Sequence, residues 1–162
     1  MIRRATVDDA PAIARVQVRT WFHAYADYVD PDDLAVFPAG RQERWNEILA
    51  GPDTTWVWDQ DGAIAGFASI GPARDDDADH RTGELYAIYV DPPAQGAGVG
   101  GKLLEHAVAG MREAGYAEAV LWTFARNDHA RAFYAGAGWK LDRGPEQRER
   151  DWAPTVRYRR AL

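Results

Sequence analysis

The sequence predicts an α/β (α+β) fold for a single domain spanning residues 1–162, in which a mixed β-sheet carries helices on both faces. The first observation behind this prediction is a succession of strand-like segment, glycine-rich turn, helical segment and second strand-like segment between residues 84 and 124. That order is typical of a βαβ unit, whose strands are parallel and whose crossover is right-handed. The second observation is a hairpin-like pair of segments before the unit, and the third is a length of 162 residues, which is ordinary for one domain.

The segments before the βαβ unit are expected to form helices and then a β-hairpin. Asp8 has the side chain of a helix N-cap, and Ile13 and Val16 behind it fall on one helical face. The sequence Asp-Gln-Asp-Gly at residues 59–62 lies between two strand-like segments, as in a hairpin turn. The expected elements are a helix over about 9–26, helical pieces at 32–33 and 38–49, and strands over 54–58 and 63–70.

The second half of the chain is expected to continue with the βαβ unit and two further strands. Gly115 is expected to end the crossover helix. Four aspartates in the loop over residues 71–82 indicate an exposed, solvated acidic loop, and a metal site there is the less favoured alternative. The expected elements are strands over 84–90, 119–124, 139–142 and 155–160, and helices over about 99–114 and 128–135.

Composition and charge argue against several classes of function. The formal net charge is −6 and the pI is about 5.2, so the basic surface that nucleic acid requires is absent. The arginine-rich run at residues 157–160 is expected on a solvated strand edge. The chain has no cysteine, which excludes a cysteine nucleophile, and its four histidines lack metal-binding spacing, so no metal is expected. No apolar run resembles a signal peptide or a membrane span, so we expect a cytoplasmic protein without a membrane partner.

A glycine-rich turn over residues 95–101 carries the clearest chemical signal. It reads Gln-Gly-Ala-Gly-Val-Gly-Gly and joins a strand to a helix. In such a turn, backbone N–H groups and the positive end of the helix dipole bind phosphate. A dinucleotide site would need an acidic residue at the end of the next strand, but Glu118 begins that strand. An ATP-binding loop would need Ser or Thr where Leu103 stands, so a nucleotide-dependent enzyme is disfavoured.

The pattern Gln-x-x-Gly-x-Gly at residues 95–100 resembles the pyrophosphate loop of the GNAT superfamily of acyl-CoA-dependent N-acyltransferases. As in that family, a strand ending in a hydrophobic-Val-x-Pro run precedes the loop, here at residues 88–92. A second family element follows, because Tyr134 stands seven residues after Asn127 and is followed by Gly-Trp at residues 138–139. Two motifs in the right order are a much stronger sign of the family than either alone.

The resemblance, which covers about residues 55–160, implies a mostly antiparallel sheet of six to seven strands with the parallel βαβ unit at its centre. It implies acetyl-CoA as cofactor, CoA as product, and dimers as a common assembly, so a homodimer is an open alternative. In that family the strand before the loop pairs with the pantetheine arm, the loop binds the pyrophosphate, and the Asn bonds the arm. The cofactor-binding residues so implied are Ile88, Tyr89, Val90, Gln95, Gly96, Ala97, Gly98, Val99, Gly100, Gly101 and Asn127.

Two side chains are expected to carry the chemistry of aminolysis. The resemblance implies that the Tyr134 hydroxyl reaches the cofactor sulfur. Tyr134 is the expected general acid, because a phenol with a pKa of about 10 stays protonated at neutral pH. An aromatic ring that only packs against the sheet is the alternative. Glu84, at the start of the strand before the loop, resembles a family position that holds a general base acting through water. An ordinary carboxylate at a strand end is an equal alternative.

The acceptor is expected against the N-terminal third of the chain. Trp21 and Tyr25 lie four residues apart on one helical face, which suits an aromatic wall beside an amine, although sealing the core is the favoured interpretation. His23 is a further candidate for that pocket. The sequence thus predicts an N-acetyltransferase that moves the acetyl group of acetyl-CoA to a primary amine of a small molecule or amino acid in a ternary complex. A protein N-terminus or lysine as acceptor, and a non-catalytic acyl-CoA-binding module, are the alternatives.

Overall fold

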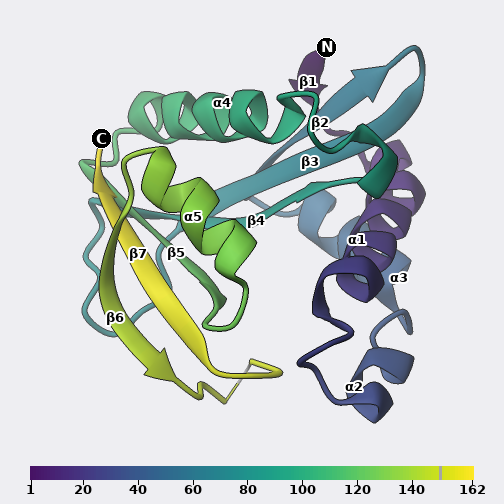
Figure 1. Ribbon diagram of the computed structural model, residues 1–162. Helices are drawn as coiled ribbons and strands as arrows, with labels where there is room; N and C mark the ends of the chain where they lie inside the picture. The colour runs from purple at the N-terminus through teal and green to yellow at the C-terminus, as the bar shows by residue number, and fades with distance from the viewer. Residues whose placement is uncertain (150) are drawn as a thin grey trace.

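The computed structural model describes residues 1–149 and 151–162, and its strands form one sheet flanked by helices (Figure 1). Across these residues the sheet has seven strands in the order β1-β2-β3-β4-β5-β7-β6. The strands are β1 (Ile2–Arg4), β2 (Thr54–Gln60), β3 (Ala63–Pro72), β4 (Thr82–Val90), β5 (Glu118–Phe124), β6 (Lys140–Glu146) and β7 (Thr155–Ala161). The helices are α1 (Ala10–Tyr25), α2 (Pro31–Val36), α3 (Arg41–Ala50), α4 (Val99–Glu113) and α5 (Asp128–Gly136), with 3-10 helices η1 (Val7–Asp9) and η2 (Pro92–Ala94).

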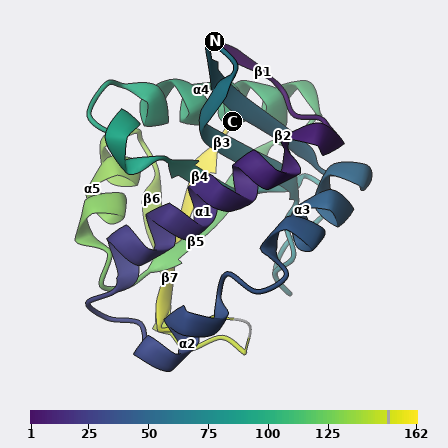
Figure 2. The same ribbon diagram turned by 90° about the vertical axis from the view of Figure 1, so that its right-hand side faces the viewer.

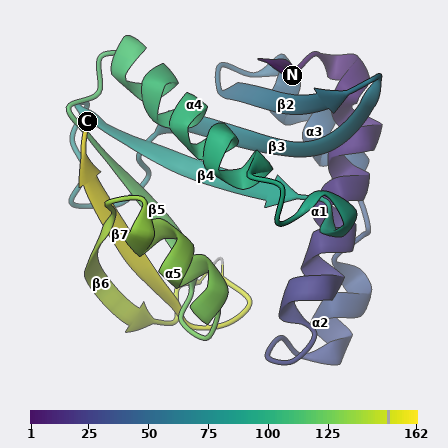
Figure 3. The same ribbon diagram turned by 45° about the horizontal axis from the view of Figure 1, so that its top comes forward.

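The sheet is mixed and mostly antiparallel, which confirms the predicted fold class. Among the described strands, β4 and β5 form the one parallel pair, and α4 is the crossover between them. The other neighbouring strands are antiparallel. α4 and α5 cover one face of the sheet, whereas α1 and α3 cover the other (Figures 2 and 3). The predicted βαβ unit therefore lies at the centre of a sheet with helices on both faces.

Two apolar clusters hold these helix layers to the sheet. In α4 the buried residues recur every three or four positions, and Leu103 and Met111 on that face pack against β3 and β4. On the opposite face, Ile13 of α1 and Trp45 of α3 pack with Phe67 of β3. Burial of each such side chain contributes about 1.5–3 kcal/mol. The two clusters thus fix the positions of the elements that frame the site.

β4 and β5 are paired at one end and separate at the other. Their parallel register joins residues 82–85 to residues 118–121 and extends no further along the described strands. On its other side, β4 stays paired with β3 as far as Val90. The remainder of β4 therefore has one strand edge that faces a gap instead of a neighbouring strand.

A bulge in β4 sets which side chains face each helix layer. The register with β3 shifts near the middle of β4 and leaves Tyr86 as the extra residue. After the bulge, Ala87 and Tyr89 pack with the cluster under α1 and α3. Ile88 and Val90 pack instead with the cluster under α4 and α5. Because of the bulge, the Tyr89 side chain lies on the sheet face under α1 and α3, opposite the face covered by α4 and α5.

The start of the chain differs from the prediction. Ile2–Arg4 forms β1 antiparallel to β2, a strand that was not predicted because three residues are too few to show a strand pattern. The prediction of Asp8 as N-cap is wrong, because Thr6 caps η1 and Asp9 caps α1. The Asp9 carboxylate accepts hydrogen bonds from the Thr6 N–H at 2.8 Å and from the Arg3 guanidinium at 2.8 and 2.9 Å. This cluster anchors β1 to the start of α1.

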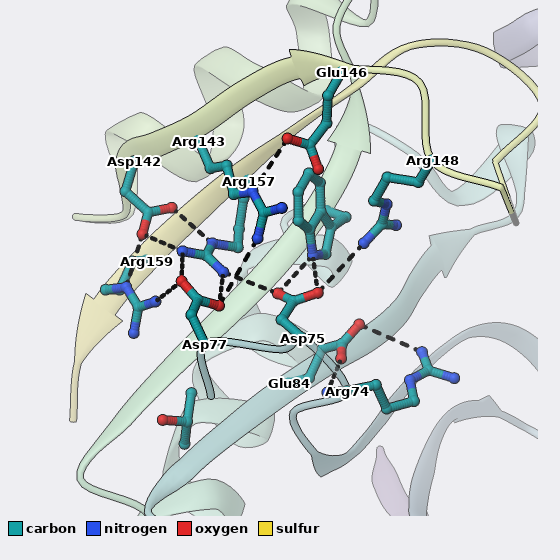
Figure 4. A network of polar contacts seen from close by, with 12 residues as sticks. Arg74, Asp75, Asp77, Glu84, Asp142, Arg143, Glu146, Arg148, Arg157 and Arg159 are labelled. Carbon is teal, nitrogen blue, oxygen red and sulfur yellow. Dashed lines mark hydrogen bonds and ion pairs between the residues drawn. The ribbon is translucent and has the colours of Figure 1, made fainter. Parts of the chain in front are cut away.

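The predicted solvated edge at residues 157–160 is wrong at its first residue. β7 lies between β5 and β6, and the Arg157 side chain is only 4% exposed. It donates hydrogen bonds to the carboxylates of Asp75, Asp77 and Asp142 (Figure 4). The prediction of a fully solvated acidic loop between β3 and β4 fails for the same reason, because the Asp75 side chain is 6% exposed. Arginine and aspartate are buried here as mutually hydrogen-bonded partners.

Candidate active site

A cavity of about 830 Å³ opens where β4 and β5 separate. Its walls come from α1, the start of α3, β4, the glycine-rich turn, β5, α5 and the segment before β7. The predicted site residues that line it are Trp21, Tyr25, Glu84, Ile88, Tyr89, Val90, Gln95, Gly96, Gly98, Gly100, Gly101, Asn127 and Tyr134. Two predicted residues do not line it, because Ala97 is exposed on the turn and Val99 is buried in the core beneath α4. The fold thus brings most of the predicted site residues to one place.

The glycine-rich turn presents its backbone N–H groups to this cavity. Gly96 and Gly98 have φ angles of 78° and 79°, a left-handed conformation that residues with a Cβ rarely adopt. Within the described chain, the N–H groups of residues 96–101 have no backbone hydrogen-bond partner, whereas the N–H of Lys102 donates to Gly98 and begins the α4 ladder. Unpaired N–H groups at the positive end of a helix form an anion site. The turn therefore fits a pyrophosphate.

The edge of β4 that faces the gap suits an extended ligand. A ligand with amide groups can pair with such an edge as an additional strand. The carbonyl of Val90 is already engaged, because it accepts hydrogen bonds from the Gln95 side chain at 2.9 Å and the Thr20 hydroxyl at 3.3 Å. In this structure the Gln95 side chain ties the glycine-rich turn to the end of β4. Its contribution to a ligand site is therefore to hold the turn in place.

Asn127 and Tyr134 both reach the cavity from α5. Asn127 is the N-cap of α5 and lies just before it, and its side-chain oxygen accepts a hydrogen bond from the Ala130 N–H at 3.1 Å. That bond leaves the Asn127 side-chain NH₂ group to donate toward the cavity. The Tyr134 ring packs near Trp139 and Tyr158, while its hydroxyl has no hydrogen-bond partner among the described residues. Burial raises the pKa of the Tyr134 hydroxyl above its ordinary value, so the group stays protonated at neutral pH.

Glu84 lies on the cavity wall as the buried member of an ion pair with the half-exposed Arg74. Its residue is 3% exposed, and one carboxylate oxygen accepts from the Arg74 N–H at 3.0 Å. The other oxygen accepts from the Arg74 guanidinium at 3.3 Å (Figure 4). The Arg74 guanidinium in turn lies 3.9 Å from the centre of the Tyr86 ring. The structure thus gives Glu84 a fixed position and a cationic partner that the sequence did not reveal.

Comparison with known proteins identifies the family to which this site belongs. The model of the acetyltransferase (GNAT) family matches residues 13–139. The chain belongs to this family. An uncharacterized N-acetyltransferase of Bacillus subtilis, YuaI, is 30% identical over 128 residues, which are 78% of this chain and 72% of that protein. A mycothiol acetyltransferase of Beutenbergia cavernae is 35% identical over 109 residues, which are 67% of this chain and 36% of that protein.

Solved structures of acetyltransferases have the same fold. PaiA N-acetyltransferase of Thermoplasma acidophilum, solved with coenzyme A, superposes with a TM-score of 0.84 at 16% identity, over 100% of this chain and 98% of that chain. The yncA protein of Salmonella typhimurium, solved with its cofactor acetyl-CoA, superposes with a TM-score of 0.76 at 22% identity, over 100% of this chain and 93% of that chain. These likenesses support the fold assignment.

Membership in the GNAT family confirms the predicted acyltransferase class, with acetyl-CoA as the cofactor that the family uses. Within the described part of the chain, none of the helices combines the length and apolar character that a membrane crossing demands. Among the same residues, no group of three or more His, Asp or Glu side chains is placed to hold a metal ion.

The aromatic side chains of this GNAT protein form the cavity wall opposite the glycine-rich turn. Trp21 stacks on Phe37 with ring centres 3.7 Å apart, and Tyr25 meets Trp21 edge-on at 4.9 Å. The indole N–H of Trp21 donates to the Tyr89 hydroxyl at 3.1 Å. Trp21 and Tyr25 are thus buried in a small core, as the favoured interpretation predicted, and they also line the cavity. Their role as a wall beside an amine stays a prediction. His23 lines the cavity as well, at an exposed position.

Several lining residues were not predicted as site residues. Arg41 reaches the cavity from the start of α3, and Arg148 and Trp152 reach it from the segment before β7. The Arg148 guanidinium lies 3.7 Å from the centre of the Trp122 ring. These residues are far apart in the sequence and follow no motif, so only the folded chain brings them together.

Proposed function

We propose that this GNAT protein transfers the acetyl group of acetyl-CoA directly to a primary amine of a small molecule or amino acid, with Tyr134 as general acid. The observation that carries the proposal is that Tyr134 lines the cavity and its hydroxyl has no hydrogen-bond partner among the described residues, while burial raises the pKa of that hydroxyl. We propose direct transfer in a ternary complex; consistent with this, the chain has no cysteine that could carry the acetyl group as a thioester between two half-reactions. We also treat residues 1–162 as one domain, since strands β1 to β7 all belong to a single sheet.

The chain supplies matched contacts for each part of the cofactor. The N–H groups of residues 96–101 would hold the pyrophosphate at the start of α4. The free edge at residues 88–90 would pair with the pantetheine arm, and the Asn127 NH₂ group would donate to the same arm. Acetyl-CoA supplies a thioester as the acetyl source. This assignment uses the anion site, the strand edge and the helix cap, all of which line the cavity.

Two proton transfers are assigned to side chains. Tyr134 would donate its proton to the departing sulfur, and its raised pKa keeps the proton in place until a thiolate forms. An ammonium acceptor must lose a proton before it reacts, and Glu84 would take that proton through water. Glu84 is suited to the role by its fixed position on the wall, although Arg74 holds both of its oxygens.

Thermal unfolding tests the cofactor first. At a concentration one hundred times its dissociation constant, acetyl-CoA should stabilise the protein by about 2.7 kcal/mol, which raises the Tm by roughly 5–10 °C for a domain of this size. NADH and ATP at the same concentrations serve as controls. A shift produced by ATP or NADH, with none from acetyl-CoA, would contradict the cofactor assignment.

Replacement of Tyr134 by Phe tests the mechanism. Loss of a general acid should lower kcat for an amine substrate by about 10²- to 10⁴-fold, while the Tm shift with acetyl-CoA persists. Tyr116→Phe is the matched control, because its hydroxyl lies outside the cavity. An unchanged kcat in Tyr134→Phe removes Tyr134 from the mechanism. Glu84→Gln is measured in the same assay. An unchanged kcat in this variant would show that Glu84 is not the general base and that its role is to pair with Arg74.

A further inference from the structure

Among the described residues, three arginines line the cavity. Two of them form ion pairs with carboxylates, and the third does not. Arg74 holds the Glu84 carboxylate at 3.3 Å, and Arg148 holds the Asp151 carboxylate at 2.5 Å. Arg41 has no carboxylate partner in the described chain, and its buried Nε has no hydrogen-bond partner there. The cavity thus contains a guanidinium that makes no hydrogen bond or ion pair to the residues that the structure describes.

The position of Arg41 is unfavourable unless a ligand compensates for it. Arg41 is the first residue of α3, where the helix dipole repels a positive charge. A buried N–H group without a partner also costs free energy. The guanidinium lies 4.7 Å from the centre of the Phe37 ring, and Phe37 stacks on Trp21. The Arg41 guanidinium therefore lies against the Phe37 ring in a place where no carboxylate of the described chain pairs with it.

Arg41 lies on the acceptor side of the cavity. It belongs to α3, which covers the sheet face opposite α4 and α5 (Figures 2 and 3). Burial raises the pKa of the Tyr89 hydroxyl, and the charge of Arg41 is among the influences that oppose the rise. Tyr89 itself accepts the hydrogen bond of Trp21. The charge of Arg41 thus acts on the aromatic wall. The proposed anion site for the pyrophosphate is elsewhere, at the start of α4.

We infer that the acceptor of this acetyltransferase is an amine that carries a carboxylate, and that Arg41 is the residue that binds this carboxylate. A guanidinium offers two parallel N–H groups that match a carboxylate. The aromatic rings of Trp21, Phe37 and Trp152 beside it favour an apolar remainder of the acceptor. Free amino acids with apolar side chains have this chemistry. The inference rests on the proposed function, because it names the acceptor class of the same site.

Steady-state kinetics with matched pairs of amines tests the inference. The panel is leucine, methionine, phenylalanine and tryptophan, each compared with its own amide, which retains the amine and side chain but lacks the charge. We expect kcat/KM for the best amino acid to exceed that for its amide at least tenfold. In Arg41→Gln this preference should fall by about 10- to 100-fold, the value of a lost charge-assisted hydrogen bond. Arg41→Lys should restore part of it, because the charge is retained.

The matched control is Arg44→Gln on the same helix. Arg44 is exposed and pairs with Glu47 at 3.1 Å, so its loss should leave the preference for the amino acid unchanged. The Tm shift with acetyl-CoA is measured for each variant, and Arg41→Gln should retain it. A weaker shift in Arg41→Gln than in Arg44→Gln would place Arg41 in the donor site and overturn the inference.

Other outcomes separate the inference from the proposed function. Equal turnover of amino acids and amides, or a preference that Arg41→Gln leaves intact, overturns the inference while the acetyltransferase assignment stands. Absence of turnover with every amine, together with a normal Tm shift by acetyl-CoA, overturns the proposed function and the inference with it. A preference for amino acids that disappears in Arg41→Gln alone supports both.

Discussion

The buried ion-pair network around Arg157 provides a sharp test of how this fold is stabilised. Arg157→Leu removes a guanidinium that is 4% exposed and that donates to Asp75, Asp77 and Asp142. Removal of one partner from a buried ion pair typically costs about 3–5 kcal/mol. Asp77 is 49% exposed and stays hydrated, and Asp142 keeps a hydrogen bond from Arg159 at 2.8 Å. Asp75 is 6% exposed and keeps contacts with the Trp122 indole and the Arg148 guanidinium, so the expected loss is at the lower end, about 3 kcal/mol.

The assay is urea unfolding together with thermal unfolding. A loss of about 3 kcal/mol should lower the Tm by roughly 6–12 °C in a domain of this size. Arg143→Leu on β6 is the control, because its side chain is 40% exposed and pairs with Glu146 at 3.1 Å. Its expected cost is below about 1 kcal/mol. Asp75→Asn added to Arg157→Leu should recover part of the loss, because it removes a buried negative charge from a network that has lost one of its guanidinium groups.

A smaller cost for Arg157→Leu than for Arg143→Leu would refute this account. Such a result would mean that the cost of burying the guanidinium cancels the gain from its hydrogen bonds, as occurs in some buried ion pairs. A double variant less stable than Arg157→Leu alone would contradict the account in a different way. It would show that Asp75 stabilises the protein mainly through its other hydrogen bonds, to the Trp122 indole at 2.9 and 3.1 Å.

Two further predictions concern acid and the glycine-rich turn. Hydrogen bonding from Arg157 lowers the pKa of Asp77 from 3.8 to about 2, so this stabilising contribution is complete above about pH 4 and is lost as the pH falls toward 2. Urea unfolding between pH 2 and 5 should therefore show a shallower pH dependence in Arg157→Leu than in the unmodified protein; parallel curves would contradict it. Gly98→Ala should cost about 1–2 kcal/mol because its φ is 79°, whereas Gly101→Ala, inside α4 with no atom within 4 Å of the new Cβ, should stabilise by up to about 1 kcal/mol. Equal Tm changes in the two alanine variants would show that the left-handed conformation of Gly98 does not penalise a side chain.

Much of the fold and the donor side of the candidate site could be predicted from the sequence, because both depend on local patterns. The period of apolar residues in α4 and the glycines of the turn are contiguous in the chain. Glycine is required at positions 96 and 98 by the positive φ angles there. Steric crowding is not the reason, because a Cβ added at either position would meet no atom within 4 Å. From the sequence, the glycine-rich turn was interpreted as a site where backbone N–H groups bind phosphate. The structure adds a backbone reason that acts even without a ligand.

The acceptor side was less predictable because it depends on residues that are distant in the sequence. Arg41 and Arg148 are more than a hundred residues apart and meet the same cavity only through the packing of α3 and the segment before β7. The arginine-rich run and the acidic loop were misjudged because each was interpreted alone, as a charged and therefore exposed segment. Once Arg157 and Asp75 are brought together, their hydrogen bonds offset the cost of burial. Charge alone therefore predicts exposure poorly when the partner lies on another strand.

The bulge at Tyr86 explains how one cavity can take a donor and an acceptor from opposite faces of the sheet. A shift of one residue in a strand exchanges the faces of all side chains beyond it. Without the bulge, Tyr89 would face α4 and Ile88 would face α1, so the hydrogen bond from Trp21 to Tyr89 could not form. With it, the aromatic wall is anchored to β4 on one face while the glycine-rich turn is built on the other. The direct transfer that we propose would require both partners at once, and the gap between β4 and β5, lined by Tyr134, is where the two faces meet.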